Sequence, residues 1–266
     1  MVPDTARTVW RVGVVLLLAG FPGAPALADA VQQDFSRTPF KLGVHDALPR
    51  PQRLSEESAH ARFLRLAWSR LNNHNSLSFQ RSDAGLACAV TAEFDFRIRP
   101  GSGRADGLGF ALLDTGEHGV AGVVAPSGIA EEPNFPASLG IGFDIYPSGP
   151  LPPQPDDLND NHVSVHFDGD TVAQFDAGPN LDLGSGNWIH AAITVKAADG
   201  SVSIVLTEGA TTTELATDLP VPGLAPYESR AWFGARTGGE NADFDLDNVA
   251  VVFTPCPPPV TLGRLP

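Results

Sequence analysis

The chain has 266 residues and a formal net charge of −14, with 27 glycines, 24 prolines and a single methionine. This acidity disfavours binding to nucleic acids and to anionic membranes, because their phosphate groups repel such a surface. The glycine and proline content favours a turn-rich all-β protein over one built from long helices.

The first 28 residues have the pattern of a secretory signal peptide. Arg7 and Arg11 precede an apolar run from Val12 to Ala19, which is too short to cross a bilayer. Ala26-Leu27-Ala28 then provides a small-x-small cleavage site. We therefore expect a secreted or periplasmic protein without a membrane span, consisting of one domain over residues 29–255 and a proline-rich tail over residues 256–266.

The segment before residue 80 gives mixed signals. One short strand is expected near residues 34–41. The Ser55-Glu56-Glu57 sequence is compatible with a helix start, but the alternation of apolar residues over 62–68 favours a strand. We predict that strand, a turn at residues 72–75 and a return strand over residues 77–81.

The clearest strand covers residues 88–98, where apolar side chains alternate with Thr91, Glu93, Asp95 and Arg97. Asp168-Gly169 is typical of a tight hairpin turn. Further strands are expected at residues 106–113, 120–125, 162–167, 171–175, 188–196, 201–206, 211–217, 231–235 and 244–253. About a dozen short strands at this spacing predict a two-sheet antiparallel jelly-roll sandwich.

The two cysteines, Cys88 and Cys256, both lie in the exported part of the chain. A disulfide between them is one expectation for an oxidising compartment. The alternative is one buried thiol and one free thiol in the tail.

Five stretches between residues 35 and 253 form a recognisable series: ADGLGF (105–110), GFDIYP (142–147), NHVSV (161–165), Trp188 at the start of an alternating strand, and FGARTGG (233–239). In this order they resemble the L-type (legume-like) lectins of the concanavalin A-like lectin/glucanase superfamily. The resemblance implies a concanavalin A-like fold and a carbohydrate partner.

In that family, the Asp of the ADG segment follows a cis peptide bond and binds sugar hydroxyls. The resemblance therefore implies that Asp106 orients the sugar and that the Ala105-Asp106 bond is cis. A buried carboxylate that accepts two hydroxyls discriminates strongly between hydroxyl geometries. The other predicted sugar-site residues are Gly107, Gly119, Gly122, Phe135 and Tyr146. The simpler alternative is that Asp106 only starts a strand and that the glycines only form turns.

Residues 139–169 read as a strand that ends at Asp144, a loop rich in proline and carboxylate, and a strand that begins at His162. Oxygen ligands select Ca²⁺, and a His admits a softer divalent ion. The resemblance implies a Ca²⁺ site whose ligands come from Asp144, the backbone oxygen of Tyr146, Ser148, the loop carboxylates (Asp156, Asp157 or Asp160) and His162. Gly142 stands where the family has a Glu, so a second divalent metal is not expected. A solvated acidic loop without a metal is the alternative.

The same superfamily contains glycoside hydrolases, so the fold alone does not decide the activity. Glu93 and Asp95 lie two residues apart on one strand face, but Ile98 stands where the E-x-D-x-x-E pattern of the superfamily has its last Glu. The prediction is a non-catalytic carbohydrate-binding protein. A glycoside hydrolase or lyase is the second hypothesis, and an adhesive or structural domain that binds no sugar is the third.

Overall fold

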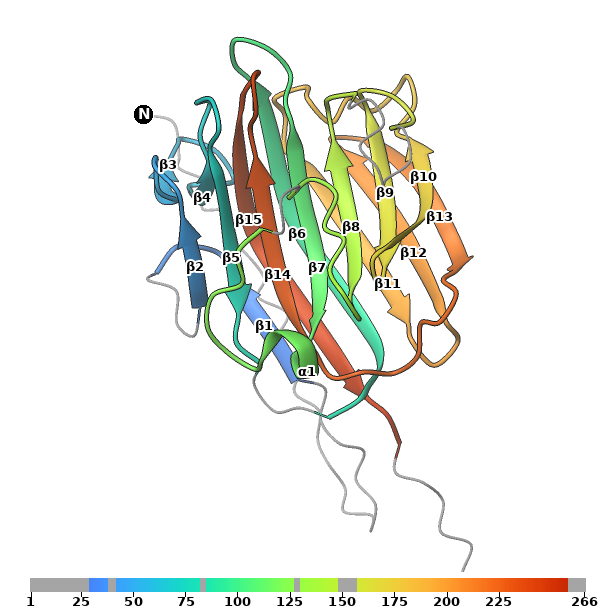
Figure 1. Ribbon diagram of the computed structural model, residues 1–266. Coiled ribbons are helices and arrows are strands. Elements are labelled where there is room, and N and C mark those ends of the chain that lie inside the picture. Colours follow the sequence, from blue (N-terminus) through green and yellow to red (C-terminus); the bar gives the residue numbers. More distant parts are fainter. Residues whose placement is uncertain (1–28, 38–41, 82–84, 127–129, 148–156, 258–266) are drawn as a thin grey trace, which may run out of the picture.

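The computed structural model describes residues 29–37, 42–81, 85–126, 130–147 and 157–257. Two antiparallel sheets pack face to face and form the predicted jelly-roll sandwich (Figure 1). Among these residues, no helix is long and apolar enough to cross a membrane. The expected signal peptide, Ser148, Asp156 and residues 258–266 of the tail lie outside the described part of the chain.

One sheet has eight strands, with β1 (Asp29–Gln33) paired to β15. Its other strands follow the spatial order β13 (Thr211–Pro220), β12 (Ser201–Glu208), β11 (Ile189–Lys196), β6 (Ala87–Pro100), β15 (Ala242–Pro255), β4 (Arg62–Ala67) and β3 (Gln52–Ser55). The second sheet has seven strands in the order β10 (Asp170–Asp176), β9 (His162–Phe167), β8 (Leu139–Asp144), β7 (Gly107–Asp114), β14 (Ser229–Arg236), β5 (His74–Phe79) and β2 (Leu42–Asp46). The short helix α1 (Thr115–His118) follows β7.

Aromatic side chains fill the space between the two sheets. Phe94 of β6 packs edge-on against Phe233 of β14, with 4.9 Å between ring centroids, and Phe96 lies 4.7 Å from Phe143 of β8. All four side chains are fully buried. Burial of each side chain stabilises the fold by about 1.5–3 kcal/mol. The alternation along β6 therefore places its phenylalanines on the face that packs against the second sheet.

Three predicted elements differ from the structure. β4 and β5 lie in different sheets and do not form a hairpin, because the connection between them carries the chain across the sandwich. Residues 34–37 form no strand; residues 38–41, the rest of that predicted strand, lie outside the described residues. The strand predicted at 120–125 is absent as well. There Gly122 has φ +88°, and Val124 bonds to side chains, accepting from Ser76 and donating to Ser78, so its backbone groups need no neighbouring strand.

The predicted disulfide joins Cys88 to Cys256, which are 168 residues apart in sequence. On the loop-entropy account, its removal is expected to lower the free energy of unfolding by about 2–5 kcal/mol. Urea denaturation with and without a reductant measures this change. The Cys88→Ser/Cys256→Ser variant should match the reduced protein, and an unchanged midpoint after reduction would contradict the prediction.

Candidate functional site

Asp106 and Asp144 lie at the same end of neighbouring strands. Asp144 is the last residue of β8, and its Cα partner on β7 is Gly107, the residue after Asp106. The amide of Ile145 donates to the carbonyl oxygen of Asp106 at 3.0 Å, and the bond between Ala105 and Asp106 is cis. The two carboxylates therefore share one rim of the sandwich, at the end where β7 begins and β8 ends (Figure 1).

A segment from the connection between α1 and β8 lies directly on the outer face of the seven-stranded sheet. We call residues 130–135 the crossing segment. A Cβ atom at Gly109, Gly140 or Gly142 would lie 1.9–2.2 Å from a backbone carbonyl oxygen of this segment. Glycine at these three positions of β7 and β8 thus lets a second layer of backbone approach the sheet.

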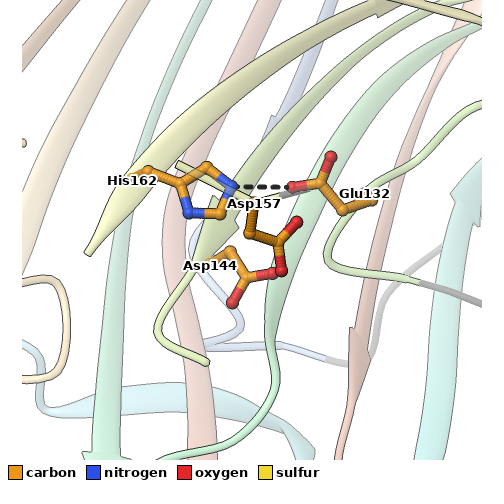
Figure 2. A group of neighbouring side chains, drawn as sticks. All are labelled: Glu132, Asp144, Asp157 and His162. Carbon is orange, nitrogen blue, oxygen red and sulfur yellow. Dashed lines mark ion pairs between the residues drawn. The ribbon is translucent and has the colours of Figure 1, made fainter. Parts of the chain in front are cut away.

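The crossing segment brings Glu132 to the rim. One ligand atom from each of Glu132, Asp144, Asp157 and His162 lies within 4.8 Å of the others, and Figure 2 shows the four side chains facing one another. Three of these residues were predicted as metal ligands, whereas Glu132 was not. A carboxylate is therefore present at the cluster although strand position 142 is glycine.

His162 is oriented as a metal ligand would be. Its Nδ1 lies 2.7 Å from the carbonyl oxygen of Asn159, and because a carbonyl only accepts, Nδ1 carries a proton. Its Nε2 is buried without a hydrogen bond and lies 3.3 Å from Oε1 of Glu132. A buried nitrogen that faces carboxylates and has no hydrogen-bond partner fits coordination of a cation, with Asn159 fixing the ring from behind.

The electrostatics of the cluster also fit a cation. Glu132 accepts from Ser164 Oγ at 2.9 Å and lies 2.5 Å from Nε2 of His166. Although burial alone would raise it, the contacts with His162 and His166 lower the pKa of Glu132 to about 2. Burial, and next the nearby Glu131, raise the pKa of Asp144 well above its usual value. Buried carboxylates this close together repel one another, and a divalent cation would offset that repulsion.

Asp106 has a different environment from the cluster. Its Oδ2 is buried and makes no hydrogen bond, although Nη2 of Arg236 lies 3.3 Å away and pairs with it by charge. The Nε of Arg236 donates to both carboxylate oxygens of Glu131, at 3.0 and 2.9 Å. Burial raises the pKa of Asp106 despite this guanidinium, and it raises the pKa of Glu131 to about 7. Asp106 therefore offers an acceptor that a ligand hydroxyl can satisfy.

A hollow of about 540 Å³ lies on the same rim, and its lining includes Arg104, two residues before Asp106, and Ile145, whose amide donates to the carbonyl oxygen of Asp106. Half-buried Tyr146 lines it, together with residues of three connections: Pro100, Gly101, Ser102, Gly103, Arg104, Ile145, Pro147, Asp160 and Glu240. Arg104 is held in place because its amide donates to Glu240 at 2.8 Å and its guanidinium pairs with Asp182. The hollow thus has one aromatic wall and a rim of polar groups.

Of the other predicted sugar-site residues, Gly107 lies at this rim as the first residue of β7, whereas Gly119, Gly122 and Phe135 lie away from it. Gly119 caps α1, which follows β7 at the end opposite Asp106, and the carbonyl of Gly122 accepts from Arg230. Phe135 is 3% exposed and packs against Trp232, so its ring face is covered. Gly119 and Gly122 precede the point at which the connection reaches the rim at Glu131. Phe135 follows that point, where the chain runs back toward the start of β8.

The predicted metal ligands also need revision in part. Asp160 is exposed and does not belong to the cluster; its backbone oxygen accepts from Arg104. The amide of Tyr146 donates to Asp144 at 2.6 Å, which places its backbone close to the cluster. The sequence analysis did not predict Glu131, Glu132 or Arg236. The one sequence feature that could have indicated the two glutamates is the set of outward-facing glycines on β7 and β8, because such glycines mark a close approach of other backbone.

Solved structures with a similar architecture include several lectins. Lectin II from Ulex europaeus matches with a TM-score of 0.62 at 13% identity, over 88% of this chain and 100% of that one. The chain has the L-type lectin fold. Lectin I-B4 from Griffonia simplicifolia, in a metal-free form, matches at TM-score 0.59 and 15% identity over 85% of this chain and 98% of that one.

A third solved structure with a similar fold is a lumenal domain. The lumenal domain of VIP36, in a Ca²⁺- and Man3GlcNAc-bound form, matches at TM-score 0.58 and 12% identity, over 89% of this chain and 90% of that one. No protein-family model and no curated protein matches the sequence. At these identities, the likeness establishes the fold and leaves the ligand to be argued from the site.

Within this lectin fold, the residues of the hydrolase hypothesis lie away from the rim. Glu93 and Asp95 belong to β6, and their side chains face outward from the eight-stranded sheet, opposite to the buried Phe94. Asp95 accepts from Asn248 at 2.7 Å and contacts His190 at 2.8 Å. Asp95 is thus engaged by side chains of neighbouring strands, and neither acid lies at the Asp106 rim.

Proposed function

We propose that this chain is a secreted, non-catalytic lectin that binds a saccharide at the rim around Asp106, beside a divalent-cation site. The observation that carries this proposal is the buried Oδ2 of Asp106, which makes no hydrogen bond, on the rim that also carries the hollow lined by Tyr146. Arg236 pairs with this oxygen by charge but forms no hydrogen bond to it, and a sugar hydroxyl would supply the missing hydrogen bond. The ring of Tyr146 offers a surface on which a sugar ring can stack.

The lectins of similar fold support a saccharide ligand. One of them, lectin UEA-II, is complexed with galactose, and the VIP36 domain is bound to Ca²⁺ and Man3GlcNAc. Secretion is supported by the signal-peptide pattern of residues 1–28 and by the disulfide, which is typical of oxidising compartments. Oligosaccharides are also a class of ligand that an acidic surface does not repel unless they carry negative charge.

In this proposal, Asp144, Asp157, Glu132 and His162 hold the cation. Ca²⁺ is the expected ion for the carboxylates, and the imidazole also admits a softer divalent ion such as Mn²⁺. When bound, the cation supplies positive charge that links β8, β9 and the crossing segment. Tyr146 and Ile145 follow Asp144 directly, so a fixed Asp144 also fixes one wall of the hollow.

A glycan array tests the proposal directly. Wild-type protein is expected to bind a defined set of saccharides, and Asp106→Asn is expected to bind them at least tenfold more weakly, since a charged hydrogen-bond acceptor is lost. Asp170→Asn, which changes an exposed residue at the start of β10, beside the end of β9 that lies away from the rim, is the matched control. Saccharide binding that persists unchanged in Asp106→Asn would remove the proposed site.

The enzyme hypothesis has its own measurement. Release of reducing ends from β-glucans is expected to be absent with the wild-type protein. Turnover that disappears in Glu93→Gln would favour a hydrolase. An array without any bound saccharide, together with no turnover, would favour the adhesive or structural alternative.

Saccharide binding is expected to weaken as the pH falls, and to do so at a higher pH than it would if Asp106 had the pKa of an ordinary Asp. Burial raises the pKa of Asp106 above 3.8, so its carboxylate becomes protonated earlier as the pH falls. The protonated acid accepts hydroxyls poorly, and the affinity is lost as the pH falls through the raised pKa. Affinity measured between pH 7 and pH 4 checks this; a flat profile down to pH 4 would contradict it.

A further inference from the structure

A second hollow, of about 580 Å³, opens at β3 and β4, at the edge of the eight-stranded sheet. Its lining carries three arginines and one acidic residue: Arg53, Leu54, Ser55, Glu56, Arg62, Phe63 and Arg99. It belongs to the other sheet and shares no lining residue with the hollow on the Asp106 rim. In a chain of net charge −14, a hollow with surplus positive charge is unusual.

The single acidic residue of this hollow is already neutralised. The carboxylate of Glu56 accepts from Nη1 of Arg97 at 3.1 Å and from the indole nitrogen of Trp188 at 3.1 Å. Asp245, buried on the adjoining sheet face, binds Arg97 and the forked guanidinium of Arg65. Asp245 also lies 3.8 Å from the guanidinium of Arg99, so Arg99 is compensated by this carboxylate, whereas neither Glu56 nor Asp245 pairs with Arg53 or Arg62.

Those arginines retain unused donors. Arg53 and Arg62 are exposed and form no ion pair or side-chain hydrogen bond with any described residue. Ser55 is the Cα partner of Arg62, so the two arginines leave the same face of the β3–β4 hairpin as diagonal neighbours. Arg99 projects from the other face of the sheet and pairs with Asp243 at 3.4 Å and with Asp245 at 3.8 Å, although its buried Nε makes no hydrogen bond.

We propose that this hollow binds an oxyanion, a carboxylate or a sulfate, carried by an acidic saccharide. Guanidinium groups match the planar, two-oxygen geometry of such anions and form charge-assisted hydrogen bonds with them. The net negative charge of the chain disfavours densely charged polymers and favours a short ligand with few anionic groups. The saccharide as carrier rests on the proposed function, whereas the oxyanion chemistry rests on the arginines alone.

Calorimetric titration at low salt tests the proposal with a short oligogalacturonate, a sulfated oligosaccharide, inorganic sulfate, and a neutral oligosaccharide of the same length. The wild-type protein is expected to bind one of the acidic saccharides, with an affinity that falls as salt is added. Arg53→Gln/Arg62→Gln is expected to weaken this binding about tenfold or more, and Arg99→Gln, which removes a guanidinium that already pairs with Asp243 and Asp245, is expected to weaken it less. Arg70→Gln, an exposed arginine outside the hollow, is the matched control.

Asp106→Asn separates this site from the rim. Acidic-saccharide binding that survives Asp106→Asn but falls in the arginine variants supports the proposal, even if the rim binds no sugar. Binding that falls in Asp106→Asn and not in the arginine variants overturns it, as does the absence of acidic-saccharide binding at millimolar concentration. Binding of inorganic sulfate alone would overturn the assignment to a saccharide. Thermal melts of each variant confirm that a loss of affinity is not a loss of fold.

Discussion

Substituting alanine for Gly142 is expected to weaken divalent-cation binding by about 10–100-fold, although residue 142 provides no ligand atom. A Cβ atom there would lie 2.1 Å from the carbonyl oxygen of Glu131 and 2.3 Å from Oγ of Ser164. The crossing segment must then move off β8, and it carries Glu132 away from Asp144 and His162. Calorimetric titration with Ca²⁺ and with Mn²⁺ measures the loss.

Gly85→Ala is the matched control for this substitution. A Cβ atom at Gly85 meets nothing within 4 Å, so this variant should bind cations as the wild type does. Cation affinity retained in Gly142→Ala would mean that Glu132 is not needed at the site. Gly142→Glu offers a second check: it restores a carboxylate on the strand but meets the same obstruction, so it should not restore binding to Glu132→Gln.

Replacing Asp144 with asparagine is expected to have the larger effect, a loss of more than about 100-fold in cation affinity. Asp144 is central because it ends β8 beside Asp106 and lies within 4.8 Å of the other three ligand groups. Its neighbours are buried acids, so the variant also removes a repulsive charge and should be no less stable than the wild type in the absence of metal.

Asp160→Asn, which changes an exposed carboxylate outside the cluster, is the control for the Asp144 variant. It should leave cation affinity unchanged. Equal effects of the two substitutions would indicate diffuse binding of cations to an acidic surface in place of a defined site. The melting temperatures of both variants, measured with a chelator present, separate lost coordination from lost stability.

The strands were largely predictable because their signal is local. The alternation of β6 and the Asp168-Gly169 turn between β9 and β10 each follow from neighbouring residues, and the structure contains both. Strand pairing is a property of the whole chain, which is why β4 and β5 were expected to pair and instead lie in opposite sheets. At 120–125, the apolar residues suggested a strand, but side chains of β5 bind the backbone there.

The residues of the candidate site also fall into two groups: those that a local motif indicates and those whose position depends on the folded chain. Asp106, Asp144, Asp157 and His162 lie on or beside short motifs, and they were identified from the sequence. Glu132 lies in a connection whose path depends on glycines of two distant strands, so no local pattern places it at the rim. Phe135 was predicted to contact a sugar because aromatic residues in loops often stack on sugar rings. In the structure its ring packs against Trp232, and the sequence alone does not reveal this contact.

The central claim is that Asp106 and the four-residue cluster act together as one saccharide site. Titration of the strongest array saccharide into metal-loaded protein, and again after chelation, tests it most directly. We expect measurable affinity in the loaded protein, and a loss of at least tenfold both after chelation and in Asp106→Asn. Equal affinity in all three samples would contradict the account.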